Sequence, residues 1–204
     1  MKPYLFPYLK PSSVIDWQNP AIQKLSERLA SQSTTETAKN CFEWVRDNIK
    51  HSGEFKLNPV TVKATDVLTH KTGFCFAKSH LLAALLRANK IPTGFCYQCL
   101  SMDGNTSPFC LHGLNAVYLD EFSSWYRVDP RGNNTNINAQ FLPPREQLAF
   151  PITLPQEVDY LEICAEPLPE IINLLTSSNS YQDVFKHLPN TAMIKPVSSI
   201  KVTE

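Results

Sequence analysis

The chain has 204 residues, enough for one sizeable core, and it balances 19 basic against 19 acidic side chains. No lysine and arginine cluster stands out, so we expect neither nucleic acid nor an anionic membrane as a partner. The proline-broken N-terminus does not read as a secretory signal, and no apolar run is long enough to span a membrane. We therefore expect a cytoplasmic protein whose six cysteines are reduced thiols.

The first third of the chain predicts two helices. Residues 1–18 are interrupted by prolines and are expected to be extended. Asn19 followed by Pro20 is typical of a helix start, and Ser33 followed by Glu36 is typical of a capping box. Behind that box, apolar residues recur at helical spacing and predict one buried stripe: Ala38, Cys41, Phe42, Val45 and Ile49. We interpret the cysteine of this stripe as core packing.

The stretch that organises the chain is a predicted helix from Ala77 to Ala88, preceded by Gly73 and Cys75. A loop or short extended piece over 52–63 and one helical turn over 66–70 lead into it. The helix has no glycine, proline or β-branched residue, and its apolar residues cover most of its circumference, which predicts burial. Cys75 falls at or just before the first turn, where unpaired N–H groups and the helix dipole favour a thiolate. Cysteine hydrolases and acyltransferases keep their nucleophile in such a place; a core cysteine near a helix start is the alternative.

The pattern then changes to β-branched, aromatic and alternating residues, which predict three antiparallel strands joined by short connections: Thr93–Ser101, His112–Leu119 and Ser124–Asp129. A polar and proline-rich tail follows, for which we expect one strand and two short helices: Leu161–Ala165, Pro169–Ser178 and Tyr181–Leu188. We see no second hydrophobic core in this tail. The chain therefore predicts one α+β domain over 1–204, with a core over 19–132 and a wrapping tail over 133–204.

Two further residues fit a cysteine nucleophile. A nucleophilic thiol needs a base, and the base needs an orienting partner. His112 opens the second predicted strand and Asp129 ends the third, so the hairpin between them is expected to bring the two side chains within reach. Taken alone, His112 is an ordinary histidine beside a loop, and Asp129 is a turn-former before Pro130. Together with Cys75 they predict a catalytic triad.

The sequence resembles the transglutaminase-like superfamily of papain-related cysteine enzymes. The resemblance covers about 40–132 and rests on blocks that occur in the order of the family: Phe42-Glu43-Trp44-Val45-Arg46-Asp47-Asn48-Ile49, Gly73-Phe74-Cys75, Leu85-Leu86-Arg87-Ala88-Asn89-Lys90-Ile91-Pro92-Thr93, His112, and Trp125-Tyr126-Arg127-Val128-Asp129-Pro130-Arg131. The whole chain, including the tail, looks like a group of small bacterial members. Papain itself fits less well, because its histidine lies much further along the chain.

The resemblance implies a fold with the nucleophile at the head of a buried helix packed on an antiparallel sheet. It also implies the triad roles for Cys75, His112 and Asp129, and chemistry at the carbonyl of a protein, peptide or small amide. Hydrolysis is the favoured outcome and amine transfer the alternative; we expect no cofactor and no metal. The chain departs from the family where Leu114 and His51 replace common aromatic residues, and no tryptophan can be assigned to the oxyanion hole. The Cys75 N–H is expected to be one oxyanion donor, and His51 is either the second or a surface histidine.

Two alternatives to a catalytic triad remain at this stage. Four soft metal ligands, Cys96, Cys99, Cys110 and His112, have tolerable zinc spacing. The first two lie three apart within a predicted strand and would point to opposite faces, which argues against a zinc knuckle. A module that binds without catalysing is also possible in principle, although all three triad residue types are present.

Overall fold

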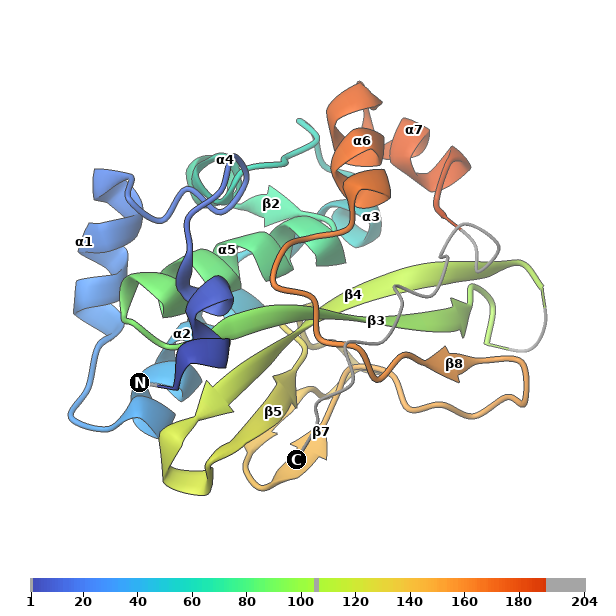
Figure 1. The fold of residues 1–204 in the computed structure, drawn as a ribbon. Helices are drawn as coiled ribbons and strands as arrows, with labels where there is room; N and C mark the ends of the chain where they lie inside the picture. The colour runs from blue at the N-terminus through green and yellow to red at the C-terminus, as the bar shows by residue number, and fades with distance from the viewer. Residues whose placement is uncertain (1, 105–106, 190–204) are drawn as a thin grey trace.

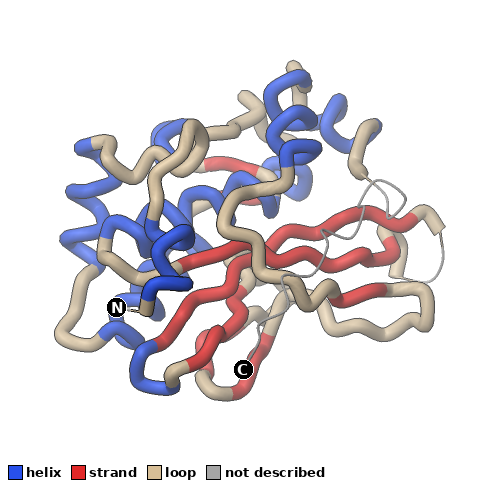
Figure 2. The backbone as a smooth tube through the Cα atoms, in the orientation of Figure 1, coloured by secondary structure: helices blue, strands red, loops and turns tan. Residues whose placement is uncertain are grey.

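The computed structural model describes residues 2–104 and 107–189 and has an α+β fold, with helices packed on one face of a curled antiparallel sheet (Figure 1). The main sheet has the order β5-β4-β3-β8, whose strands are β5 (Ser124–Val128), β4 (Phe109–Leu119), β3 (Thr93–Ser101) and β8 (Val158–Asp159). Two small pairings accompany it, one parallel and one antiparallel: β1 (Lys50–His51) with β2 (Thr72–Gly73), and β6 (Gln140–Leu142) with β7 (Arg145–Gln147). Figure 2 shows the long strands forming one layer beneath the helices.

Six helices begin close to where the sequence predicts them: α1 (Pro20–Leu29), α2 (Thr34–Asn48), α4 (Ala64–His70), α5 (Cys75–Ala88), α6 (Pro169–Ser177) and α7 (Tyr181–Lys186). Three short ones lie where no helix is predicted: η1 (Pro3–Leu9), α3 (Ser52–Phe55) and η2 (Asp120–Phe122). The side chain of Asn19 caps α1 by accepting from the N–H of Ala21. The capping box of α2 is only half formed. Ser33 accepts from the N–H of Glu36 at 3.1 Å, but the Glu36 carboxylate binds the Ser31 hydroxyl.

Three expectations about local structure are wrong. The segment Pro3–Leu9 is a 3₁₀ helix rather than extended chain; it tolerates its prolines and buries Leu5. Residues Ser52–Phe55 form one helical turn inside the predicted loop, and the left-handed backbone of Lys56 ends it. The strand predicted over Leu161–Ala165 is replaced by β8 at Val158–Asp159, followed by a single bridge between Cys164 and Phe95.

The core lies between α5 and the sheet. All of α5 except Ala88 is buried, and the helix packs against β4 and β3 below it and against α1, α2 and α4 around it. The backbone of β4 passes close beneath α5, because a Cβ at Gly113 would lie 2.6 Å from the Phe76 ring. The amide of Asn115 on β4 donates to the carbonyls of Ser79 and Gly94, and so holds the helix in register with both central strands.

The tail packs onto this same core. The buried side chains of its two helices join the main apolar cluster: Ile171, Leu174, Leu175 and Val184. A small separate cluster contains Cys96, Leu114 and Ala116. Over the described residues, the helices are all too short or too polar to cross a membrane.

Candidate active site

Cys75 is the first residue of α5, at the centre of the molecule. Phe74 precedes it in extended backbone and accepts the first helical hydrogen bond, from the N–H of Lys78. The Cys75 amide belongs to the first helical turn, whose N–H groups have no partner inside the helix. The residue is only 7% exposed. The thiol therefore lies at the positive end of a buried helix, as the sequence predicts.

His112 and Asp129 meet across the β4–β5 hairpin. The pairing of these strands ends at Asn115 with Val128, so Asp129 lies one residue beyond the ladder. The two side chains still reach each other: Nε2 of His112 lies 2.7 Å from Oδ2 of Asp129, and both residues are buried. The contact predicted from hairpin spacing is therefore confirmed. Because Nε2 binds the carboxylate, Nδ1 is the ring nitrogen left for a reaction partner.

The protonated form of His112 is strongly favoured. Burial disfavours the imidazolium, but the charges of Asp129 and Cys75 and hydrogen bonds with both outweigh it and raise the pKa of His112 to about 10. The electrostatic effect of Cys75 on His112 places the thiol near the imidazole. A protonated imidazole beside a thiol is the arrangement that activates a cysteine nucleophile.

Three further residues, whose contacts sequence reasoning missed, support the pairing of His112 with Asp129. The N–H of Ala149 donates to Oδ2 of Asp129 at 3.3 Å, while the N–H of Arg131 donates to Oδ1 at 3.1 Å. The ring of Phe150 stands at 90° to His112, with the ring centroids 5.1 Å apart. Backbone N–H donors have no sequence signature. The pairing of Ala149 with Asp129 could therefore not have been found from residue types.

His51 lies beside the segment that leads into Cys75. Its backbone pairs with Gly73, and its ring centroid is 5.4 Å from that of Phe74. The half-buried side chain accepts from the N–H of Glu54 through Nδ1 at 3.3 Å. Burial lowers the pKa of His51 well below its ordinary value, and the nearby positive charge of Arg131 adds to that effect. The ring is therefore neutral with its proton on Nε2, which leaves one N–H donor.

The tail also reaches the site, and we call Tyr181–Pro189 the closing segment. The ring centroid of Phe185 lies 5.6 Å from that of Phe74, the residue before Cys75. The carbonyl of Pro189 accepts from the N–H of Leu111, the residue before His112, at 2.9 Å. The closing segment therefore contacts both chain segments that carry the reacting side chains.

The four residues of the zinc alternative have other surroundings. Cys96 joins the small cluster with Leu114 and Ala116, and the Nε2 of His112 is bound to Asp129. In the ranges 2–104 and 107–189, no three His, Cys, Asp or Glu side chains form a group that could hold a metal ion.

The cysteines other than Cys75 are poor nucleophiles. Burial raises the pKa of each of three thiols to about 12: Cys41, Cys96 and Cys110. It also raises the pKa values of Cys99 and Cys164. Only the thiolate attacks an alkylating reagent. These five thiols should therefore react slowly at neutral pH.

We expect limited iodoacetamide at pH 7 to label Cys75 first, because it alone has a helix N-terminus and an imidazolium beside it. Peptide mapping by mass spectrometry measures the label at each cysteine, and unfolded protein provides the reference in which all six react. Faster labelling of any other cysteine in the folded protein, with Cys75 unmodified, would contradict the assignment of the nucleophile.

Comparisons with known proteins cover the same part of the chain. The family described as the transglutaminase-like superfamily matches residues 23–130, more than half of the sequence. A solved structure described as a candidate cysteine protease from Cytophaga hutchinsonii is 22% identical with a TM-score of 0.51, covering 64% of this chain and 43% of that one. The periplasmic domain of TgpA from Pseudomonas aeruginosa is 19% identical with a TM-score of 0.47, covering 64% and 48%. The chain thus spans less than half the length of these structures, and no curated protein matches it.

Proposed function

This chain belongs to the transglutaminase-like superfamily, and from that premise we propose that it is a cysteine enzyme acting on the carbonyl of an amide or peptide. The observation that carries the proposal is the buried 2.7 Å contact between His112 and Asp129, near Cys75, whose charge acts on the same imidazole. A histidine that joins a thiol to a carboxylate is the arrangement that nucleophilic acyl transfer requires. The substrate is a protein, a peptide or a small amide.

Each triad residue has one role in the proposed reaction. The Cys75 thiolate attacks the carbonyl carbon, and the carbonyl oxygen takes the negative charge. His112, protonated at neutral pH, gives its proton to the departing amine, so that the C–N bond breaks and a thioester remains. The neutral imidazole then removes a proton from the incoming water or amine. Asp129 holds the ring by Nε2 and stabilises the imidazolium each time it forms.

The negative oxygen needs donors that are already in place. We propose the backbone N–H of Cys75 as one and the Nε2–H of His51 as the other. Two observations support His51: it lies beside the Gly73–Phe74 lead-in, and its Nδ1 accepts from the N–H of Glu54, which leaves Nε2 to carry the proton of the neutral ring. A neutral histidine can donate to the oxygen without taking a proton from the nucleophile.

We expect water to be the main acceptor of the acyl group, so that the enzyme is a hydrolase. Cys75 and His112 are 7% and 5% exposed, and a site this enclosed admits water more readily than an amine carried on a long side chain. Transfer would also need a face that binds the amine. The test supplies an acyl donor, titrates a primary amine such as methylamine, and quantifies acid and amide products by mass spectrometry.

Acid should dominate at millimolar amine, with product formation absent in a Cys75→Ala control. Methylamine and a peptide lysine should be compared, because the first can enter where the second cannot. If amide is the main product at millimolar concentrations of either amine, the hydrolase proposal is wrong and the protein is an amine-transfer enzyme.

A further inference from the structure

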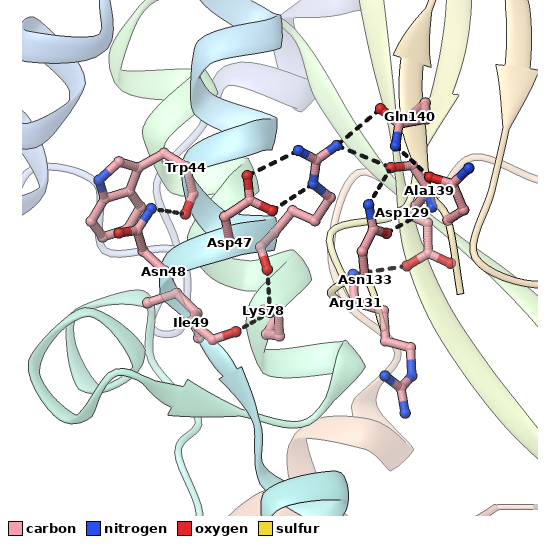
Figure 3. Close-up of polar contacts among 12 residues, drawn as sticks. Trp44, Asp47, Asn48, Ile49, Lys78, Asp129, Arg131, Asn133, Ala139 and Gln140 are labelled. Atoms are coloured by element: carbon pink, nitrogen blue, oxygen red, sulfur yellow. Dashed lines mark hydrogen bonds and ion pairs between the residues drawn. The ribbon is translucent and has the colours of Figure 1, made fainter. Parts of the chain in front are cut away.

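A buried lysine lies one helical turn beyond the nucleophile. Lys78 belongs to α5, and its side chain has no exposed surface. Its ammonium donates to the carbonyl of Ile49, where α2 ends, and lies 3.5 Å from the carbonyl of Arg46 (Figure 3). In the part of the chain that the structure describes, the hydrogen-bond partners of this charge are thus carbonyl oxygens rather than a carboxylate.

The ammonium lies where three chain segments meet. The first is α5, which begins with Cys75. The second is the corner from Ile49 into β1, which carries His51 two residues after the bonded carbonyl. The third is the loop after Asp129, because a Cβ placed on Gly132 would lie 3.6 Å from the Lys78 Nζ. One side chain therefore contacts or adjoins the segments that carry the nucleophile, the carboxylate and the proposed second oxyanion donor.

Holding these segments together with a buried ammonium carries a free-energy cost, because the charge is removed from water. Burial lowers the pKa of Lys78 to about 7, and the positive charge of Arg131 contributes; the carboxylates of Asp129, Asp47 and Glu54 act in the opposite direction. An apolar side chain of the same length would avoid this cost. The charge is also felt at His51, because the positive charge of Lys78 is one of the causes that lower the pKa of that histidine.

We infer that Lys78 is a positioning residue for the oxyanion hole: it fixes the corner that carries His51 against the nucleophile helix. This inference rests on the proposed function. It gives Lys78 no contact with substrate and no part in proton transfer. The loss of Lys78 should therefore weaken stabilisation of the oxyanion while leaving the thiol reactive.

Two reagents that react with Cys75 separate an effect on oxyanion stabilisation from an effect on the reactivity of the thiol. Acylation of Cys75 by p-nitrophenyl acetate passes through an oxyanion, whereas alkylation by iodoacetamide does not. We expect Lys78→Met to slow acylation about 10-fold and His51→Ala about 100-fold, the lower end of the loss for one oxyanion donor. Iodoacetamide alkylation should stay within about twofold of the parent rate in both. The double variant should acylate no more slowly than His51→Ala alone, since Lys78 acts through His51.

His80→Leu is the matched control. His80 is another buried polar residue of α5, and its Nδ1 binds the carbonyl of Val62 at 2.8 Å rather than the corner that carries His51. The His80→Leu substitution should leave the ratio of the acylation rate to the alkylation rate unchanged, even if it lowers the melting temperature. Equal slowing of both reactions by Lys78→Met, or additive losses in the double variant, would overturn the inference.

The parent protein provides a second test if Lys78→Met does not fold. The ¹⁵N chemical shifts of His51 should report a neutral ring protonated on Nε2 from pH 5 to 9, and titration of this ring near its ordinary pKa would overturn the inference. A Cys75→Ala variant keeps the two proposals apart. If the Cys75→Ala variant is acylated as fast as the parent, Cys75 is not the nucleophile and the proposed function is wrong. If acylation is lost in Cys75→Ala but Lys78→Met slows acylation and alkylation equally, only the role of Lys78 is wrong.

Discussion

Replacing Cys75 with alanine is expected to lower kcat/KM for an amide substrate by about 10⁶-fold, the scale on which loss of a triad nucleophile acts. The effect is this large because no covalent intermediate can form without the thiol. His112 then has no Cys75 adduct whose departing amine it could protonate. The rate can be measured on a panel of fluorogenic peptide amides. Any panel member that the parent enzyme cleaves gives the reference.

Cys164→Ala is the matched control for that experiment. Cys164 is half-buried and pairs its backbone with Phe95, and burial raises the pKa of its thiol. Its loss should leave the rate within about twofold of the parent. A Cys75→Ala enzyme that keeps more than a tenth of the parent activity would show that the thiol at the head of α5 is not the nucleophile.

Asp129→Asn should lower activity by about 10⁴-fold while preserving the shape of the site. The asparagine oxygen can still accept from the N–H of Arg131, but the amide NH2 then takes the place of Oδ2. It offers N–H, not a negative charge, to Nε2 of His112, and the N–H of Ala149 loses its acceptor. The imidazole is then turned to the wrong tautomer, with its proton on the side that faces Cys75. The charge that raises the pKa of His112 to about 10 is also lost.

The effect of Asp129→Asn on the stability of the folded protein should depend on pH. A base whose pKa is raised by folding stabilises the folded state fully below its unfolded value near 6.5, and this contribution disappears as pH rises through about 10. Asp129→Asn should therefore lower the melting temperature most at pH 6, and the difference from the parent should narrow toward pH 10. The limb of the rate profile that reports a protonated His112 should shift to lower pH.

Asp159→Asn gives the matched carboxylate control. Asp159 also forms a close contact, 2.6 Å from the Arg127 guanidinium, but it lies on β8 outside the site. Its replacement should leave the rate profile unchanged. If Asp129→Asn reacts as fast as the parent from pH 5 to 9, Asp129 has no part in the triad.

Much of the fold could be predicted because its strongest signals are local. The β4–β5 hairpin is short, so chain distance alone placed His112 within reach of Asp129. The helix that begins at Cys75 has an apolar surface all round, and it is buried all round. What could not be predicted depends on contacts between distant segments. Ala149 reaches Asp129 through a backbone N–H, and the closing segment reaches Leu111 through a backbone carbonyl.

Lys78 shows a signal that sequence reasoning could have used. A lysine on a helix that is mostly apolar and buried on every face has no solvent to reach, so its charge must find partners inside the protein. The sequence therefore indicates a buried ammonium. It does not indicate that the partners are the last carbonyls of α2, because the approach of these two helices is a tertiary feature.

The position of the closing segment links access to the site with local unfolding. Phe185 and Pro189 contact the residues immediately before Cys75 and His112, yet they belong to a helix of six residues and the few that follow it. Detaching so short an element costs far less free energy than unfolding the core. Substitutions in this segment can therefore change how often the thiol meets solvent while leaving the reacting groups untouched.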